Sequence, residues 1–134
     1  MPPRPPVPDD LSERIRIKRI YRAVRVSDGK RILVDRLWPR GVSKDRARLH
    51  AWEKDIAPSD DLRHWFHASP NRWDTFKTRY LRELEAKGDL IGKIAECARD
   101  GVVTLLFAAK NEDHNNAVVL QEYLQKRLRQ GTGS

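Results

Sequence analysis

The chain has 134 residues, a formal net charge of +8, four tryptophans and one cysteine. This length is typical of one domain, the aromatic residues argue against a disordered chain, and a single cysteine excludes an intrachain disulfide. No segment is long or apolar enough to span a bilayer, and the start lacks the apolar stretch of a secretion signal. We therefore expect a cytoplasmic protein with no membrane partner.

Residues 1–12 hold five of the eight prolines. Such a composition predicts a disordered, proline-rich arm. A polyproline II ligand is the less favoured alternative for this arm. A single α/β domain is expected over residues 13–128, followed by a flexible tail over residues 129–134.

The first half of the domain contains short strands separated by turn signals. The continuous apolar run that ends at Val34 is typical of a strand covered on both faces. Ser43 is in position to cap a short helix. Residues 50–57 suit either a helix end or a strand, and we favour a strand. The expected elements are a strand over 15–20, a turn over 27–30, a strand over 31–37 and a helix over 44–49.

The second half is mainly helical. A short helix is expected over 60–66, and a longer one should begin at Pro70 and end at Gly88. Further elements are a helix over 90–98, a buried strand over 102–109 and a helix over 116–128. This alternation predicts a small α/β domain, with a mostly parallel sheet of about four strands and helices on both faces.

Polar residues follow two of the expected strands. Asp35 begins a charged, aromatic segment at or just past the carboxyl end of the second strand, and residues 110–115 follow the last strand and precede a helix. Ligands of open α/β sheets bind at the carboxyl ends of the strands, and a helix start favours an anion. The candidates at this edge are Asp35 and His114 as catalytic acid or base, and Arg36, Trp38, Arg40, Lys54, Lys110 and Asn115 as ligand-binding residues.

Each of these residues also has a structural interpretation. An Asp–Arg ion pair could organise the turn, Trp38 could seal the core, and Asn115 could cap the helix. The sequence predicts no metal or cofactor, because the four histidines form no ligand pattern and no glycine-rich phosphate loop is present. We expect Cys97, on an apolar helix face, to be a buried and unreactive thiol.

The basic charge is concentrated in residues 14–48, which hold 13 lysines and arginines against three aspartates. A block of this kind attracts phosphate, nucleic acid or an acidic partner, although it is equally typical of a solvated face.

Several motifs together resemble one bacterial family. They are VDRLWPRGVSK at 34–44, WEKDIAPS at 52–59, LRHWFH at 62–67, VTLLFAAK at 103–110 and HNNA at 114–117. The resemblance is to the domain of unknown function 488 family, the YeaO-like proteins, and covers residues 15–128. It implies a small, single-domain, cytoplasmic α/β protein, and it carries no activity or substrate with it.

Three functions follow as hypotheses. The first is binding of a phosphate-bearing small molecule or nucleotide at the carboxyl edge of the sheet, with or without catalysis. The second is a nucleic-acid-binding accessory protein that uses the basic 14–48 segment. The third is a protein-interaction module without a ligand. The sequence leaves the ligand, the reaction and the oligomeric state open.

Overall fold

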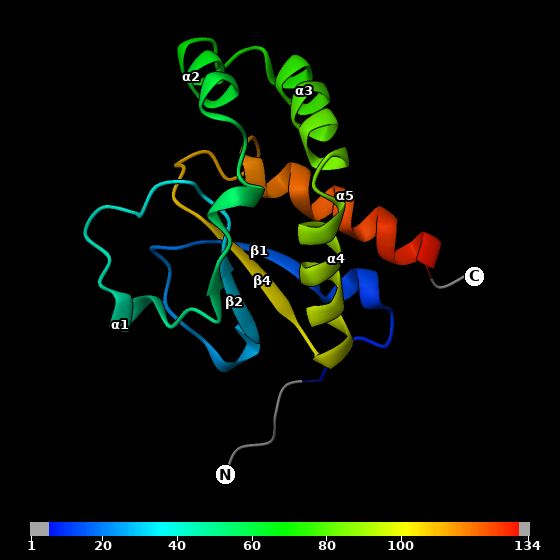
Figure 1. The fold of residues 1–134 in the computed structure, drawn as a ribbon. Helices are drawn as coiled ribbons and strands as arrows, with labels where there is room; N and C mark the ends of the chain where they lie inside the picture. Colours follow the sequence, from blue (N-terminus) through cyan, green and yellow to red (C-terminus); the bar gives the residue numbers. More distant parts are fainter. Residues whose placement is uncertain (1–5, 132–134) are drawn as a thin grey trace.

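The computed structural model describes residues 6–131, and its centre is a four-stranded sheet in the order β1-β4-β2-β3 (Figure 1). The strands are β1 (Ile15–Arg19), β2 (Lys30–Leu33), β3 (Ala51–Trp52) and β4 (Val103–Phe107). Every pairing is parallel, with Ile17 opposite Leu105 and Ile32 opposite both Leu105 and Ala51. The predicted α/β fold with a parallel sheet is confirmed.

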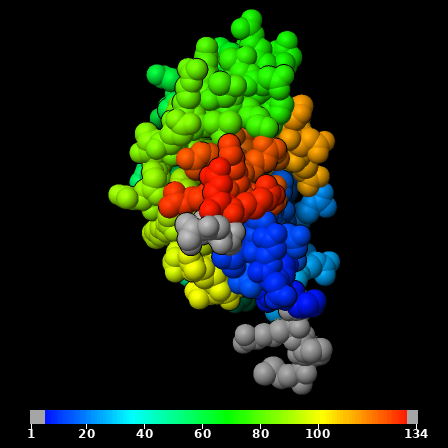
Figure 2. Space-filling model, turned by 90° about the vertical axis from the view of Figure 1, so that its right-hand side faces the viewer, coloured from blue at the N-terminus to red at the C-terminus, as the bar shows by residue number. Residues whose placement is uncertain are grey.

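Helices lie on both faces of the sheet but cover them unequally (Figure 1). The larger core lies under the long helices and contains Ile15, Ile32 and Leu105. Figure 2 shows α5 lying between the N-terminal segment and α3, and it packs against both. The helices are α1 (Lys44–Ala47), α2 (Asp60–Ala68), α3 (Trp73–Glu85), α4 (Gly88–Cys97) and α5 (Asn116–Gly131), with single 3-10 turns η1 (Leu11–Arg14), η2 (Val26–Asp28), η3 (Lys54–Ile56) and η4 (Ala98–Asp100).

The second face of the sheet is covered by loops and by α1, and it has a buried ionic group in place of a large apolar core. The carboxylate of Asp28 accepts hydrogen bonds from Lys18 at 2.9 Å and from Arg31 at 2.6 Å. Burial raises the pKa of Asp28, but the bonds from Lys18, the Arg25 amide and Arg31 outweigh burial and hold it below the usual value. Thr104 also donates to the Asp28 carbonyl oxygen. These bonds hold the segment between β1 and β2 against the sheet. No long crossover helix is needed in this connection.

Several element boundaries differ from the prediction. The second strand ends at Leu33, and residues 50–57 form a two-residue strand followed by a 3-10 turn. Pro70 does not begin a helix: the Arg72 amide donates to the Ser69 carbonyl oxygen, so residues 69–72 form a turn and α3 starts at Trp73.

Gly88 does not end the third helix, as predicted, but opens α4. The helix ends at Glu85, and the chain turns through Ala86 and Lys87 without a left-handed residue, so no glycine is needed there. The predicted arm and tail fall partly on residues 1–5 and 132–134, which lie outside the described residues. Within the described part, η1 begins at Leu11 and α5 continues to Gly131.

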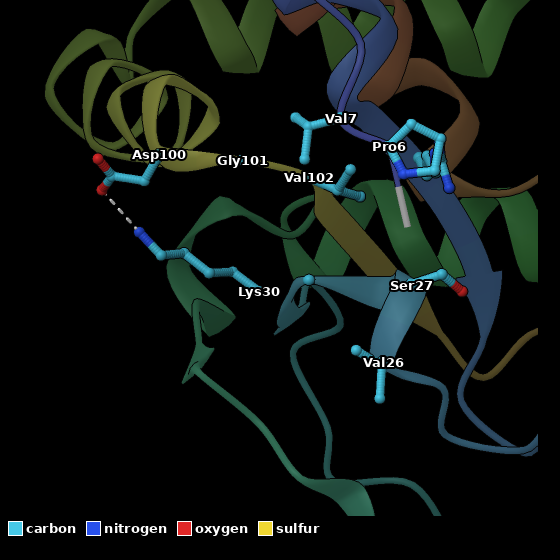
Figure 3. Close-up of a pocket in the computed structure, with 10 residues that line it drawn as sticks. Pro6, Val7, Val26, Ser27, Lys30, Asp100, Gly101 and Val102 are labelled. Carbon is cyan, nitrogen blue, oxygen red and sulfur yellow. Dashed lines mark hydrogen bonds and ion pairs between the residues drawn. The ribbon is translucent and has the colours of Figure 1, made fainter. Parts of the chain in front are cut away.

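A hollow of about 480 Å³ lies at the amino ends of β2 and β4, the opposite edge from the predicted site (Figure 3). Val7, Val26 and Val102 contribute apolar walls, and the ion pair between Lys30 and Asp100, 2.9 Å long, lies at its side. None of the residues predicted to bind a ligand or to catalyse a reaction lines this hollow.

The start of β2 depends on a glycine. Gly29 has a φ of +63°, and a Cβ at this position would collide with the Val102 carbonyl oxygen, which accepts the Lys30 amide. We expect Gly29→Ala to lower the free energy of unfolding by about 1–3 kcal/mol, measured by urea denaturation. Gly88→Ala is the control, since Gly88 has open space and no positive φ. Equal unfolding midpoints for the two variants would contradict this account.

Candidate functional site

The carboxyl edge of the sheet is organised around Asp35, directly after β2. Its Oδ2 accepts the Ala108 amide at 2.9 Å, and its Oδ1 accepts the side-chain amide of Asn116 at 3.1 Å. The same Asn116 nitrogen donates to the Val34 carbonyl oxygen at 3.0 Å. The indole of Trp52 donates to the Asp35 carbonyl oxygen at 2.7 Å. Asp35 therefore links β2, β3, the end of β4 and the start of α5.

The environment of Asp35 changes its acidity. Burial raises the pKa of Asp35 above the usual value, and the hydrogen bonds from Ala108 and Asn116 reduce that increase without cancelling it. A carboxyl group that keeps its proton at higher pH is a feature of acid–base sites. Here, however, each carboxylate oxygen already has a donor from the scaffold.

Tyr80 of α3 is buried near this edge and keeps its proton. Its hydroxyl donates to the Ile56 carbonyl oxygen at 2.7 Å, and the side chain is fully buried. Burial, followed by the charges of Glu83 and Asp35, raises the pKa of Tyr80 far above the usual value. It anchors η3 to α3 as a neutral donor.

Arg36 lies in a group of mixed charges. Its Nε is 3.7 Å from Oδ1 of Asp60, and Nη2 of Arg63 is 3.4 Å from the same oxygen. Both contacts are long, and within residues 6–131 neither Nε has a hydrogen-bond partner although both atoms are buried. Lys87 donates to the Ala57 carbonyl oxygen, and burial, with a contribution from Arg36, lowers its pKa against the opposing charge of Glu83. Arg36 and Arg63 therefore share one acid, Asp60, at the carboxyl edge.

Three predicted site residues have structural partners. Trp38 packs edge-on against Trp52, with 5.3 Å between ring centroids, and donates to the Val42 carbonyl oxygen. Asn115 is buried and caps α5, because its Oδ1 accepts the Val118 amide. The exposed ring of His114 stacks on Trp73, a half-buried aromatic residue of α3, at 4.6 Å.

The other predicted residues are cations on the surface. Arg40, Lys54 and Lys110 are exposed, and Lys54 lies 5.5 Å from the Trp52 ring centroid. In the described part of the chain, no hydrogen bond or ion pair joins the side chains of Arg40, Lys110 or His114 to Asp35. The structure therefore separates a scaffold cluster around Asp35 from solvent-facing cations outside it.

Sequence reasoning missed Asn116, the residue that connects Asp35 to α5. Two consecutive asparagines at a helix start were a usable signal, because one can cap the helix while the next reaches back to the strand. Arg63 and Lys87 carried no signal, since only the packing of α2 and α3 brings them near Arg36.

Comparison with known proteins identifies the family. A family model described as "Inactive DUF488-N3 subclade" matches residues 14–134 of this chain. Uncharacterized protein YeaO of Escherichia coli K12 is 43% identical over 111 residues, which cover 83% of this chain and 96% of that protein. The chain belongs to the DUF488 family. Uncharacterized protein Rv3073c of Mycobacterium tuberculosis H37Rv is 40% identical over 114 residues, covering 85% and 96% of the two chains. No solved structure matches significantly.

This DUF488 chain gathers no group of three or more metal-ligating side chains within its described residues. None of the helices in the described part is long and apolar enough to cross a membrane. The expected family resemblance is confirmed, and the family adds no substrate to the geometry above.

Asn116 should be a major contributor to stability. Asn116→Ala leaves Oδ1 of Asp35 and the Val34 carbonyl oxygen without their shared donor. We expect the free energy of unfolding to fall by about 1–3 kcal/mol, measured by urea denaturation. Gln130→Ala, an exposed change on the same helix, should have no measurable effect. A similar small effect at both positions would show that the bridge contributes little.

Asp35 should give the stability a characteristic pH dependence. Because its pKa is raised in the folded state, the folded protein holds this proton more tightly than the unfolded chain. Its stabilising contribution is therefore present at acid pH and is lost as the pH rises through the folded pKa. Asp35→Asn lacks this titration, so the stability of the wild type minus that of the variant should fall from about pH 4 towards neutral pH. A difference that stays constant or rises would overturn the assignment.

Proposed function

We propose that this DUF488 protein is a non-catalytic nucleic-acid-binding accessory protein. Its phosphate-binding surface is the basic lobe, which we define as residues 40–48. This is the second of the functions that the sequence left open. The observation that carries the proposal is the pairing of charges, which differs between the basic lobe and the rest of the 14–48 block.

Outside the basic lobe, five of the nine cations of the block form ion pairs. Lys18 and Arg31 share Asp28, and acids from distant segments pair with three more: Arg22 with Glu112, Lys30 with Asp100, and Arg36 more loosely with Asp60. In the basic lobe, four exposed cations stand against one acid, Asp45, and none forms an ion pair within residues 6–131. They are Arg40, Lys44, Arg46 and Arg48.

The basic lobe is anchored to the body. Ala47 is buried in the small core of the second face, and Val42 and Leu49 pack against it. Nε of the buried Arg31 donates to the Ala47 carbonyl oxygen at 3.0 Å. The lobe lies on the side of the sheet away from α4 and α5 (Figure 1). Its cations are therefore presented on a fixed surface.

This arrangement favours a polyanion over a small ligand. Exposed cations spread along a surface neutralise successive phosphates of a nucleic acid, whereas a small anion requires polar groups that converge in a concave site. Asp35, the expected acid or base, is engaged by Ala108 and Asn116. The description of the subclade as inactive agrees with binding without catalysis.

Charge removal in the basic lobe tests the proposal. The triple variant Lys44→Gln, Arg46→Gln, Arg48→Gln should bind a labelled oligonucleotide of about 15 nucleotides at least tenfold more weakly in fluorescence anisotropy. The salt dependence of log affinity should lose a slope of about three, one for each lost phosphate contact. Titrations at about 50 mM and 200 mM salt measure both quantities.

A matched control removes the same charge elsewhere. Arg72→Gln, Arg82→Gln, Lys126→Gln alters exposed cations on or beside α3 and α5 and should keep nearly wild-type affinity. The proposal fails if the wild type does not bind at low salt, or if the two triple variants lose affinity equally.

A further inference from the structure

An exposed tyrosine beside the basic lobe is held in a fixed orientation. Tyr21 follows β1, and 45% of its surface remains exposed. Its hydroxyl donates to the Arg40 carbonyl oxygen at 2.9 Å. The guanidinium of Arg19 lies over the ring, 4.7 Å from the centroid. One contact fixes the tip of the side chain and the other occupies one face of the ring, so a stacking partner has to use the opposite face.

Cationic residues flank Tyr21 on the segments that contact it. Arg40 belongs to the basic lobe, and its backbone holds the hydroxyl. On the other side, Nε of Arg19 donates to the Ala109 carbonyl oxygen at 3.0 Å, next to the exposed Lys110. The loop that carries Lys110 is joined to the loop after β1 by the bidentate pair of Arg22 and Glu112. The ring therefore lies between the basic lobe and Lys110.

We infer that the nucleic acid is single-stranded, that one base stacks on the exposed face of Tyr21, and that Arg40 and Lys110 neutralise phosphates on either side of it. The inference rests on the proposed function and names its substrate class. Bases of a duplex are stacked on one another and offer no free face, whereas a single strand offers a π-face at every base. An aromatic ring flanked by cations is the arrangement that single-strand-binding surfaces use.

Tyr21 also connects two loops through its hydroxyl, and a purely structural role would depend on that bond. Stacking depends on the ring instead. Tyr21→Phe removes the hydrogen bond to Arg40 and keeps the ring, whereas Tyr21→Leu removes the aromatic face and keeps apolar bulk. The pair of variants therefore separates the two roles.

The experiment compares a labelled single strand with a duplex of the same length, at one low salt concentration, for the wild type, both Tyr21 variants and the triple variant of the basic lobe. Tyr21→Leu should weaken single-strand binding about tenfold and change duplex binding less than about twofold, because a duplex presents only phosphates to the surface. Tyr21→Phe should stay within about threefold of the wild type on both ligands. Circular dichroism and urea unfolding confirm that the variants fold.

Each other outcome has a distinct meaning. If Tyr21→Leu leaves single-strand binding unchanged while the triple variant weakens it, the stacking role is wrong and the proposed function stands. If Tyr21→Leu weakens both ligands equally, the ring does not select a single strand and the inference is overturned. If Tyr21→Phe loses as much as Tyr21→Leu, the hydroxyl bond is what matters and the inference is overturned as well. If the wild type binds neither ligand, the proposed function fails and the inference fails with it.

Discussion

The arrangement of the carboxyl edge depends on one partly buried carboxylate. Asp35 accepts hydrogen bonds from the backbone after β4 and from Asn116 at the start of α5, and its carbonyl oxygen accepts the indole of Trp52 in β3. Parallel strands leave their ends without a shared hairpin, so an interaction that crosses between them fixes their relative positions. A residue with the chemistry of a catalytic acid is thereby used to hold the sheet edge together.

Much of the fold was predictable from sequence because it depends on local apolar patterns. The apolar run before Asp35 and the one that forms β4 predicted the strands, and the helix after Asn115 began where expected. The turn at Pro70 and the short β3 were harder to predict from the sequence, because their boundaries depend on hydrogen bonds that form only in the folded chain. The candidate site shows the same division. Residue types pointed to the carboxyl edge as a candidate site, but the Ala108 backbone amide, a partner of Asp35, could not be predicted from any side-chain pattern.

The basic block shows why counting charges does not locate a binding surface. Residues 14–48 appear uniformly basic in the sequence, yet Arg22 and Lys30 are paired with Glu112 and Asp100, which lie far along the chain. Such surface pairs add little stability, but they remove net charge from the surface around them. Within residues 6–131, folding therefore pairs several cations elsewhere in the block and leaves all four cations of the basic lobe without an ion pair.

The basic lobe exists because the second face of the sheet has so little to bury. Its buried apolar residues are Ile20, Leu33, Ala47 and Leu106, with Trp38 and Trp52 among the partly buried side chains packed against them. Asp28 and its partners lie on the same face. A core of this size is closed by a loop and a single helical turn, so no long helix is required between β2 and β3. The same short segment must then send apolar side chains inward and leave its remaining side chains in solvent. Because those remaining side chains are mostly arginine and lysine, covering the core also produces an anchored, positively charged surface.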